Sequence, residues 1–370
     1  MNALVQISRF LVGGLFIFSG LIKINDPVGT AIKLEEYFEV FAADFAPFFA
    51  AFVPAALFLS VLLSVLEVVL GVAVLVNYRM KITAWILLGL IVFFTFLTFY
   101  SAYFDKVTDC GCFGDAIKLT PWQSFIKDII LLVLILIIFI RRNDQKPFLT
   151  SYTADITIGV VAFVNVMGAV LAIQHLPYLD FRAYKIGANI PRLMQPSEQL
   201  KYKYIMTKDG IEEEFIDYPT EQGYEFKEMI LLNPEAQPKI TDYSVWNPEG
   251  DFTEQTFEGN KLLIIMYDAL KADTESISVI KELISQLPAD IDPVILTSSG
   301  EKIFENFRHE HQLAIPYYFA DATVLKTIIR ANPGLVLVQN GVVVGKWHHN
   351  DVPDAGKIQG IVRAGVASSE

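Results

Sequence analysis

Five long apolar runs, all within residues 1–177 of a 370-residue chain, constrain its fold more strongly than any other feature of the sequence. Each run approaches the ~20 apolar residues that a helix needs to cross the hydrocarbon core of a bilayer. A spanning segment of this kind must be helical, because lipid offers no partners for backbone N–H and C=O groups. The predicted transmembrane helices cover residues 5–24, 54–76, 82–104, 122–140 and 156–176.

The first apolar run has the position of a secretory signal, but the residues after it argue for a retained helix. A signal peptide ends in a small-residue cleavage site. This run continues instead into Lys23-Ile24-Asn25-Asp26-Pro27. We therefore expect it to stay in the membrane.

Charge divides the chain at the same place as hydropathy. Residues 1–177 carry 11 lysines and arginines against 12 acidic residues, whereas residues 178–370 carry 18 against 29. The second part is thus strongly acidic, which argues against a nucleic-acid partner and against docking on anionic lipid headgroups. The break predicts one membrane domain and one globular domain.

Short basic loops predict the orientation of the helices. Arg79 and Lys81 lie between the second and third runs, and Arg141, Arg142 and Lys146 lie between the fourth and fifth. The positive-inside rule assigns both loops to the cytoplasm. We expect a multi-pass protein of a bacterial inner membrane. Its N-terminus would be cytoplasmic, and the loop after the third helix and the C-terminal domain would be periplasmic.

The chain has two cysteines, Cys110 and Cys112, and both lie in that periplasmic loop, where disulfides form and persist. Gly111 between them lets the backbone turn tightly. A bridge closing so small a ring departs from relaxed geometry and is easily reduced, while it adds little as a structural clip. Three interpretations stay open: a redox pair, a passive or reduced pair, and a metal site, for which His175 is the only further ligand that the topology brings near.

Ionisable residues also fall inside the predicted spans. Glu67 lies in the middle of the second run, where an ionised carboxylate is costly unless it is paired or neutral. Arg9 in the first run is the predicted partner, and Lys127 and Asp128 lie in the fourth run. The Glu67–Arg9 pair would either hold the helices together or relay protons beside a thiol or a membrane quinone, the one candidate cofactor.

Residues 28–49, between the first two runs, mix aromatic and acidic side chains. The segment is too charged to span the membrane and too apolar to be freely solvated. We expect it to lie as an amphipathic segment at the outer interface. It is either a plain anchor or a lid over a site in the helices.

The soluble part is predicted to form short strands followed by an α/β domain. Strand patterns at 202–207 and 213–218 fall within residues 178–250. Beyond them, strands are expected at 262–267, 293–297, 317–319, 335–339 and 342–347, and helices at 274–287, 301–310 and 323–330. Alternating strands and helices, closed by a hairpin at Asn340-Gly341, predict an α/β sandwich with a mixed sheet.

This order, with Pro333 before the hairpin, resembles the thioredoxin fold over residues 240–370. In that family the proline in this position is cis and faces a redox dithiol, which corresponds to residues 267–274. That segment has no cysteine here, which excludes thioredoxin-type exchange by this domain alone. The resemblance implies a partner-binding face at Pro333 and Asp268. Asp268 and Asp273 are either ordinary loop carboxylates or groups that have taken over chemistry.

The membrane part resembles the DoxX superfamily and, within it, the MauE-like proteins linked to methylamine utilisation. The matching motifs are Arg9, Phe-Ser-Gly-Leu-Ile-Lys-Ile-Asn-Asp-Pro at 18–27, Glu-Val-Val-Leu-Gly at 67–71 and Cys-Gly-Cys-Phe-Gly-Asp at 110–115. The fusion to a thioredoxin-like domain is similar to a Bacteroidetes type of membrane protein. The resemblance implies a four-helix membrane core and a role in disulfide formation in exported proteins.

Together these features predict four parts of the chain. These are a DoxX/MauE-like four-helix domain at 1–146, a fifth transmembrane helix at 147–177, a periplasmic linker with short strands at 178–250 and a thioredoxin-like domain at 251–370.

The leading hypothesis for function is thiol–disulfide redox chemistry at Cys110 and Cys112, which would make the chain an oxidoreductase. Its partners would be the lipid bilayer and an exported protein with thiols or a periplasmic redox protein. The alternative is a non-enzymatic membrane scaffold whose thioredoxin-like domain binds a protein or a small ligand. Coupled solute transport is disfavoured, because the spans are few and only Glu67 is firmly intramembrane.

Overall fold

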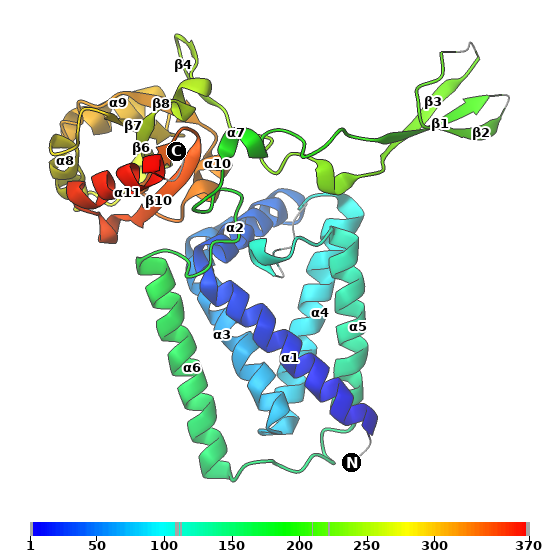
Figure 1. Cartoon of the computed structure of the whole chain (residues 1–370). Helices are drawn as coiled ribbons and strands as arrows, with labels where there is room; N and C mark the ends of the chain where they lie inside the picture. Colours follow the sequence, from blue (N-terminus) through cyan, green and yellow to red (C-terminus); the bar gives the residue numbers. More distant parts are fainter. Residues whose placement is uncertain (1–2, 108–110, 112, 209, 221–222, 368–370) are drawn as a thin grey trace. The chain divides into compact units, whose positions relative to one another are not determined.

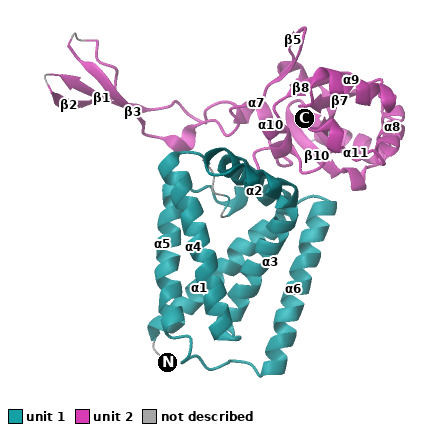
Figure 2. Cartoon of the chain, turned by 180° about the vertical axis from the view of Figure 1, so that it is seen from behind, with its two compact units in different colours: residues 1–181 teal, residues 182–370 magenta. Residues whose placement is uncertain are grey.

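The computed structural model describes residues 3–107, 111, 113–208, 210–220 and 223–367 (Figure 1). The chain divides into two compact units, residues 1–181 and 182–370, which Figure 2 colours separately. We describe each unit by itself.

Unit 1 is helical. Its elements are α1 (Ala3–Asn25), α2 (Pro27–Asp44), the 3-10 helix η1 (Pro47–Ala55), α3 (Ala56–Leu75), α4 (Met80–Phe104), the short η2 (Gly114–Ala116), α5 (Pro121–Ile140) and α6 (Ser151–Gln174). Helices α1, α3, α4 and α5 form a bundle, and α2 lies across the end of it that is far from the N-terminus (Figure 1).

The five predicted helices are present. Within the described residues, five helices are long and apolar enough to cross a bilayer, and they coincide with the five apolar runs. At the start of α5, the Thr120 hydroxyl oxygen accepts a hydrogen bond from the Gln123 backbone N–H, and the Gln123 side-chain oxygen accepts one from the Thr120 backbone N–H. This capping box ends the cysteine-containing loop at a defined point.

Glycines bring α1 and α3 together in an antiparallel pair. A Cβ atom on Gly20 would lie 2.8 Å from the Ser64 carbonyl oxygen, and one on Gly71 would lie 2.8 Å from that of Gly13. Only residues without a side chain allow two membrane helices to approach so closely. The register that results places the second half of α1 beside the first half of α3.

The amphipathic segment of residues 28–49 is helix α2 followed by the start of η1. Asp26 caps α2 by accepting a hydrogen bond from the Gly29 backbone. The Ser60 hydroxyl donates to the Pro27 carbonyl at 2.7 Å, and the hydroxyls of Tyr37 and Ser101 are 2.8 Å apart. Bonds to α3 and α4 therefore hold α2 against the bundle.

Unit 2 contains two sheets and their covering helices. The three-stranded antiparallel sheet has the order β2-β1-β3, with β1 (Tyr202–Lys208), β2 (Ile211–Phe215) and β3 (Glu225–Leu231). The seven-stranded mixed sheet has the order β10-β9-β6-β7-β8-β4-β5, with β4 (Val245–Asn247), β5 (Gly250–Asp251), β6 (Asn260–Met266), β7 (Ile291–Thr297), β8 (Tyr317–Ala320), β9 (Gly334–Gln339) and β10 (Val342–His348).

The remaining elements of unit 2 are helical. They are α7 (Ile190–Leu193), η3 (Pro234–Ala236), η4 (Glu254–Phe257), η5 (Ala269–Lys271), α8 (Ile277–Ser285), α9 (Glu301–Glu310), α10 (Ala322–Ile328), η6 (His349–Asp351) and α11 (Ala355–Ala367).

The predicted α/β domain with a mixed sheet is confirmed. Strands β6, β7 and β8 are parallel, and β9 and β10 form the antiparallel hairpin that Asn340-Gly341 predicts. All residues from Leu262 to Met266 are buried, as expected for a strand with both faces covered. The peptide bond between Asn332 and Pro333 is cis, as the resemblance to thioredoxin implies. The thioredoxin-like identity of the domain stays a prediction.

Candidate functional site in the membrane unit

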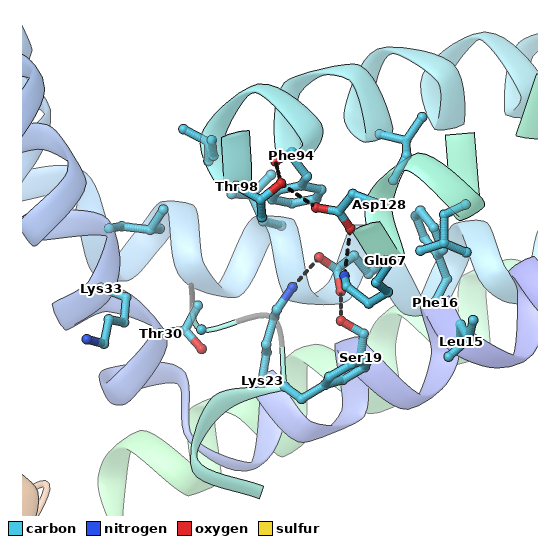
Figure 3. Close-up of a pocket in the computed structure, with 18 of the residues that line it drawn as sticks. Leu15, Phe16, Ser19, Lys23, Thr30, Lys33, Glu67, Phe94, Thr98 and Asp128 are labelled. Atoms are coloured by element: carbon cyan, nitrogen blue, oxygen red, sulfur yellow. Dashed lines mark hydrogen bonds and ion pairs between the residues drawn. The ribbon is translucent and has the colours of Figure 1, made fainter. Parts of the chain in front are cut away.

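A pocket opens among the helices of unit 1, at the end of the bundle that α2 covers (Figure 3). Its empty space is about 860 Å³, a volume that includes open solvent. Most of its lining is aliphatic or aromatic. The polar members come from five helices: Ser19, Lys23, Thr30, Lys33, Tyr37, Glu67, Thr98, Lys127 and Asp128. We call it the polar pocket.

One buried ion pair links α1 to α3 in this pocket. The Lys23 Nζ atom lies 2.5 Å from Glu67 Oε1, and the Ser19 hydroxyl donates to Glu67 Oε2 at 2.8 Å. The side chains of Lys23 and Glu67 are 9% and 4% exposed. Ser19 and Lys23 are one helical turn apart and therefore share a face of α1. The Glu67 carboxylate is thus held by both charge and hydrogen bonds.

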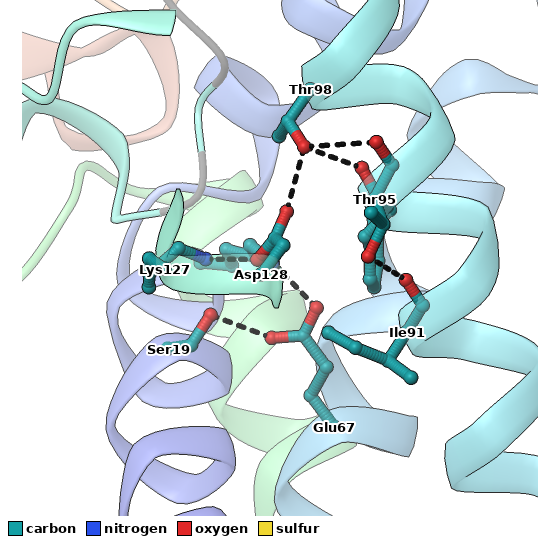
Figure 4. Close-up of polar contacts among 9 residues, drawn as sticks. Ser19, Glu67, Ile91, Thr95, Thr98, Lys127 and Asp128 are labelled. Carbon is teal, nitrogen blue, oxygen red and sulfur yellow. Dashed lines mark hydrogen bonds and ion pairs between the residues drawn. The ribbon is translucent and has the colours of Figure 1, made fainter. Parts of the chain in front are cut away.

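A second buried carboxylate faces the same space from α5. Asp128 accepts hydrogen bonds from Lys127 Nζ at 2.6 Å and from the Thr98 hydroxyl of α4 at 3.0 Å. The Asp128 side chain is 1% exposed, whereas that of Lys127 is 22% exposed. Figure 4 shows Asp128 with its partners Thr98 and Lys127, and Glu67 with its partner Ser19, between the same helices. The pocket therefore holds two carboxylates and their two ammonium partners.

Arg9 does not join this cluster. Its guanidinium donates to the Val74 and Leu75 carbonyls at 3.0 and 2.7 Å, where α3 ends and its last carbonyls have no partner within the helix. The predicted pairing of Arg9 with Glu67 is thus corrected to Lys23 with Glu67. The reason is register, since Arg9 precedes Ser19 by ten residues, or about 15 Å of helix.

The cysteine-containing loop contributes to the wall of the pocket. Cys110 and Cys112 lie outside the described residues, but Gly111 and the buried Phe113 both line the pocket. The Phe113 ring lies 5.6 Å from that of Phe18, centroid to centroid, and 5.4 Å from Lys127 Nζ. Each predicted redox cysteine is therefore covalently bonded to a residue of the pocket wall.

Helix α2 covers the pocket with side chains from one face. Thr30, Lys33 and Tyr37 contribute to the lining, and Lys33 also forms an ion pair of 3.1 Å with Glu36. At its end, Asp44 accepts hydrogen bonds from the Tyr100 hydroxyl and from Lys106. These two donors, the tyrosine above all, lower the pKa of the Asp44 carboxyl. The carboxylate stays ionised and ties α2 to α4.

In unit 2, the loop at Asp268 is joined to the cis proline. The Asn332 side chain donates to the Asp268 carbonyl at 2.7 Å, and the Asp273 N–H donates to the Asn332 carbonyl at 2.8 Å. His349 donates to the Pro333 carbonyl. Burial acts to raise the pKa of Asp273, but hydrogen bonds from Ser276 and the nearby His349 lower it overall. The structure thus brings Pro333, Asp268 and Asp273 together.

The metal alternative rests on Cys110 and Cys112, which lie outside the described residues. Within the described part of the chain, no three His, Cys, Asp or Glu side chains lie close enough together to hold an ion. His175, the additional ligand considered from the sequence, ends α6, and its N–H donates to the Leu171 carbonyl.

The membrane region matches a known family. Residues 1–141 match the family model described as Methylamine utilisation protein MauE. The membrane region is MauE-like. The match spans α1 to α5 and includes the cysteine-containing loop, but it covers less than half of the chain. No curated protein matches the chain. The MauE-like region and the five apolar helices together indicate a multi-pass membrane protein.

Six polar members of the polar pocket were missed as site residues in the sequence: Ser19, Lys23, Thr30, Lys33, Tyr37 and Thr98. Lys23 lies within the motif at 18–27. Because it is near the end of the predicted helix, its sequence position is typical of a lysine whose ammonium group reaches the membrane interface. Thr98 lies in an apolar run where hydroxyls commonly bond to their own helix, as this one also does. Ser19 and Lys23 are one helical turn apart and can therefore bind the same partner. This spacing, together with a glutamate in the middle of the next span, is the signal that would have identified the Lys23–Glu67 ion pair.

Proposed function

We propose that this chain is a MauE-type inner-membrane protein that supports disulfide formation in exported proteins through Cys110 and Cys112. In one turnover the disulfide between these cysteines accepts two electrons and two protons from a pair of thiols on the partner. The partner gains a disulfide, and Cys110 and Cys112 become thiols. Such an exchange passes through a mixed disulfide.

The observation that carries the proposal is that Gly111 and Phe113 line the polar pocket. Consecutive Cα atoms are about 3.8 Å apart, so Cys110 and Cys112 are each one residue from that wall. The pocket holds Lys23–Glu67 and Lys127–Asp128, groups suited to proton transfer in a water-poor environment. The match of residues 1–141 to the MauE model supports the same reading.

The proposal includes an orientation in the membrane. The basic loops at 76–79 and 141–150 are joined to one another, because the Asn77 side chain donates to the Lys146 carbonyl and Phe148 N–H donates to the Val76 carbonyl. They therefore share one face, which the positive-inside rule makes cytoplasmic. The cysteine-containing loop and the C-terminal domain are then periplasmic, where exported thiols are met.

The test is thiol trapping in intact cells. Free thiols are alkylated, the bound ones are released by reduction, and a second alkylating group of different mass reports the redox state of Cys110 and Cys112. We expect both oxidised and reduced forms, and a partner captured as a mixed disulfide in either Cys110→Ala or Cys112→Ala. Cysteines that stay wholly reduced in an oxidising periplasm, with no captured partner, would contradict the proposal.

A second candidate is a membrane scaffold whose C-terminal domain binds a partner without redox chemistry. The observation in its favour is the loop after β6, which has no cysteine, is tied to Asn332 and exposes 79% of Leu270. If this function is the correct one, Cys110→Ser with Cys112→Ser leaves the cellular phenotype intact, while Leu270→Asp abolishes it.

A further inference from the structure

Each ion pair of the polar pocket is neutral as a whole, because it joins one ammonium group and one carboxylate. Lys23 faces Glu67, Lys127 faces Asp128, and Lys33 is paired with Glu36. An ion entering this space would add a charge without a counterion in a region of low dielectric constant, which is costly. The pocket therefore favours a neutral ligand.

The same residues require that the ligand be polar at one end. The ammonium groups of Lys23 and Lys127 lie beside the carboxylates of the pocket, and an ammonium carries three N–H donors and no acceptor. A lipid acyl chain has no hydrogen-bond acceptor for these N–H donors. A neutral molecule with carbonyl oxygens accepts hydrogen bonds from Lys23 and Lys127 while the carboxylates keep the charges balanced.

Aromatic rings provide flat surfaces next to both ammonium groups. Lys23 Nζ lies 5.1 Å from the centre of the Phe94 ring, and Lys127 Nζ lies 5.4 Å from that of Phe113. All four residues line the pocket. A planar conjugated ring stacks on such walls and directs its oxygens to the ammonium groups. The lining also includes six aliphatic side chains that suit an isoprenoid tail: Leu15, Leu34, Leu63, Ile91, Leu97 and Leu131.

We propose that the polar pocket binds the head group of a membrane quinone, whose carbonyl oxygens accept hydrogen bonds from Lys23 and Lys127. This inference rests on the proposed function for the role of the ligand, which is to reoxidise Cys110 and Cys112. The two thiols lose two electrons and two protons and form the disulfide bond. The quinone gains two electrons and two protons and leaves as a quinol.

The carboxylates have a part in that reaction. Negative charge develops on the quinone oxygens as electrons arrive, and the ammonium groups of Lys23 and Lys127 stabilise it. Lys23 and Lys127 each transfer one proton to a quinone oxygen. Glu67 and Asp128 accept the two protons that the thiols release and pass them to the two neutral lysines, to which they are hydrogen-bonded.

Photolabelling tests the site separately from the redox reaction. An azido-substituted short-tailed quinone is added to the full-length protein in lipid nanodiscs, irradiated, and mapped by peptide analysis with and without excess unlabelled quinone. We expect competed labelling on peptides of α1, α4 or α5, and equally on the variant Cys110→Ser with Cys112→Ser. Labelling that excess quinone does not reduce would overturn the inference.

Substitutions define the residues involved. Lys23→Met combined with Glu67→Met removes an ion pair as a unit, so that neither charge is left unpaired, and Lys127→Met removes the second donor. We expect each to weaken quinone binding about ten-fold or more, the loss of one charge-assisted hydrogen bond. Lys81→Met, an exposed residue on the opposite end of α4, is the matched control and should bind as the wild type does. Unchanged binding in both pocket variants would refute the assignment.

The two proposals fail in different ways. If quinone labels the pocket but Cys110 and Cys112 are never oxidised by it, the quinone site stands and the proposed thiol chemistry is wrong. If the cysteines cycle normally while the pocket variants neither bind less quinone nor reoxidise more slowly, the thiol chemistry stands and the quinone site is wrong.

Discussion

The core of unit 2 and the polar pocket of unit 1 bury different kinds of side chain. In the sheet of unit 2, all five buried residues of β6, from Leu262 to Met266, are apolar. In the bundle, one part of the core is equally apolar, around Val74, Leu87 and Ile135, but the pocket end buries ionised side chains. A buried ion pair is commonly less stabilising than apolar side chains of the same volume. The apolar side chains of the sheet core are therefore explained by the stability they give to the fold. The buried ion pairs of the pocket are not explained by stability alone.

The largest effect is expected from breaking one ion pair on one side only. Glu67→Ala leaves Lys23 buried without its counterion and should destabilise unit 1 by roughly 3–5 kcal/mol. Denaturant titration of the protein in detergent measures the change. Lys23→Met combined with Glu67→Met should recover most of the loss, because no unpaired charge remains. If the double variant is as unstable as the single one, the unpaired charge of Lys23 is not the cause of the destabilisation.

An apolar truncation in unit 2 should cost nearly as much but leave the pocket untouched. Leu337→Ala removes a fully buried side chain of β9 and should destabilise unit 2 by about 2–5 kcal/mol through the cavity it leaves. Calorimetry of the intact protein would show the shift, and quinone photolabelling should not change. The matched control Leu270→Ala, at a side chain that is 79% exposed, should stay within about 0.5 kcal/mol of the wild type. Altered photolabelling in Leu337→Ala would show that the two regions are coupled.

A smaller effect is expected where α1 meets α3 next to the pocket. Gly20→Ala places a Cβ atom 2.8 Å from the Ser64 carbonyl oxygen and should cost about 1–3 kcal/mol as the helices separate. Gly14→Ala, six residues earlier in α1, meets nothing within 4 Å and should be neutral. Denaturant titration compares the two variants, and quinone binding should weaken in Gly20→Ala alone. Equal stability and equal quinone binding in the two variants would mean that the close contact of α1 with α3 at Gly20 does not position Lys23.

The smallest effect at neutral pH concerns a buried phenol of unit 2. Burial raises the pKa of Tyr243 to about 12. Its contribution to stability is complete below the unfolded pKa of about 10 and is lost as the pH rises from there to about 12, at most about 3 kcal/mol. Tyrosinate absorbance of the wild type minus that of Tyr243→Phe should titrate near pH 12. A difference curve centred near pH 10 would mean that Tyr243 is accessible to solvent.

Local patterns predicted a large share of this fold. Helix α9 covers the predicted residues 301–310, and strands β6 to β10 fall within a few residues of their predicted bounds. Hydropathy period and turn residues are local properties, so a single sequence reveals them. Strands β3, β4 and β5 and helix α11 were not predicted. Strand β3 begins with five charged or apolar residues that are all exposed, and it lacks a clear alternation.

The candidate site was predicted only in outline. Glu67, Lys127 and Asp128 stood out as ionisable residues in apolar runs, and the cysteine pair stood out by its isolation. Which of them meet depends on the depth and rotation of each helix, and these do not follow from the composition of one run. Arg9 was therefore assigned to Glu67, although it bonds to the end of α3.

The sequence by itself determined that this chain has a membrane part of five helices and an acidic α/β domain, because apolar length, charge and turn chemistry act over short stretches. Only the tertiary structure decided that Lys23 neutralises Glu67 and that Gly111 and Phe113 line the same pocket. Close contact at Gly20 and Gly71 sets the register of α1 against α3. A shift of one turn there, about 5.4 Å, would give Glu67 a different partner, which is why helix packing and not helix formation makes the site.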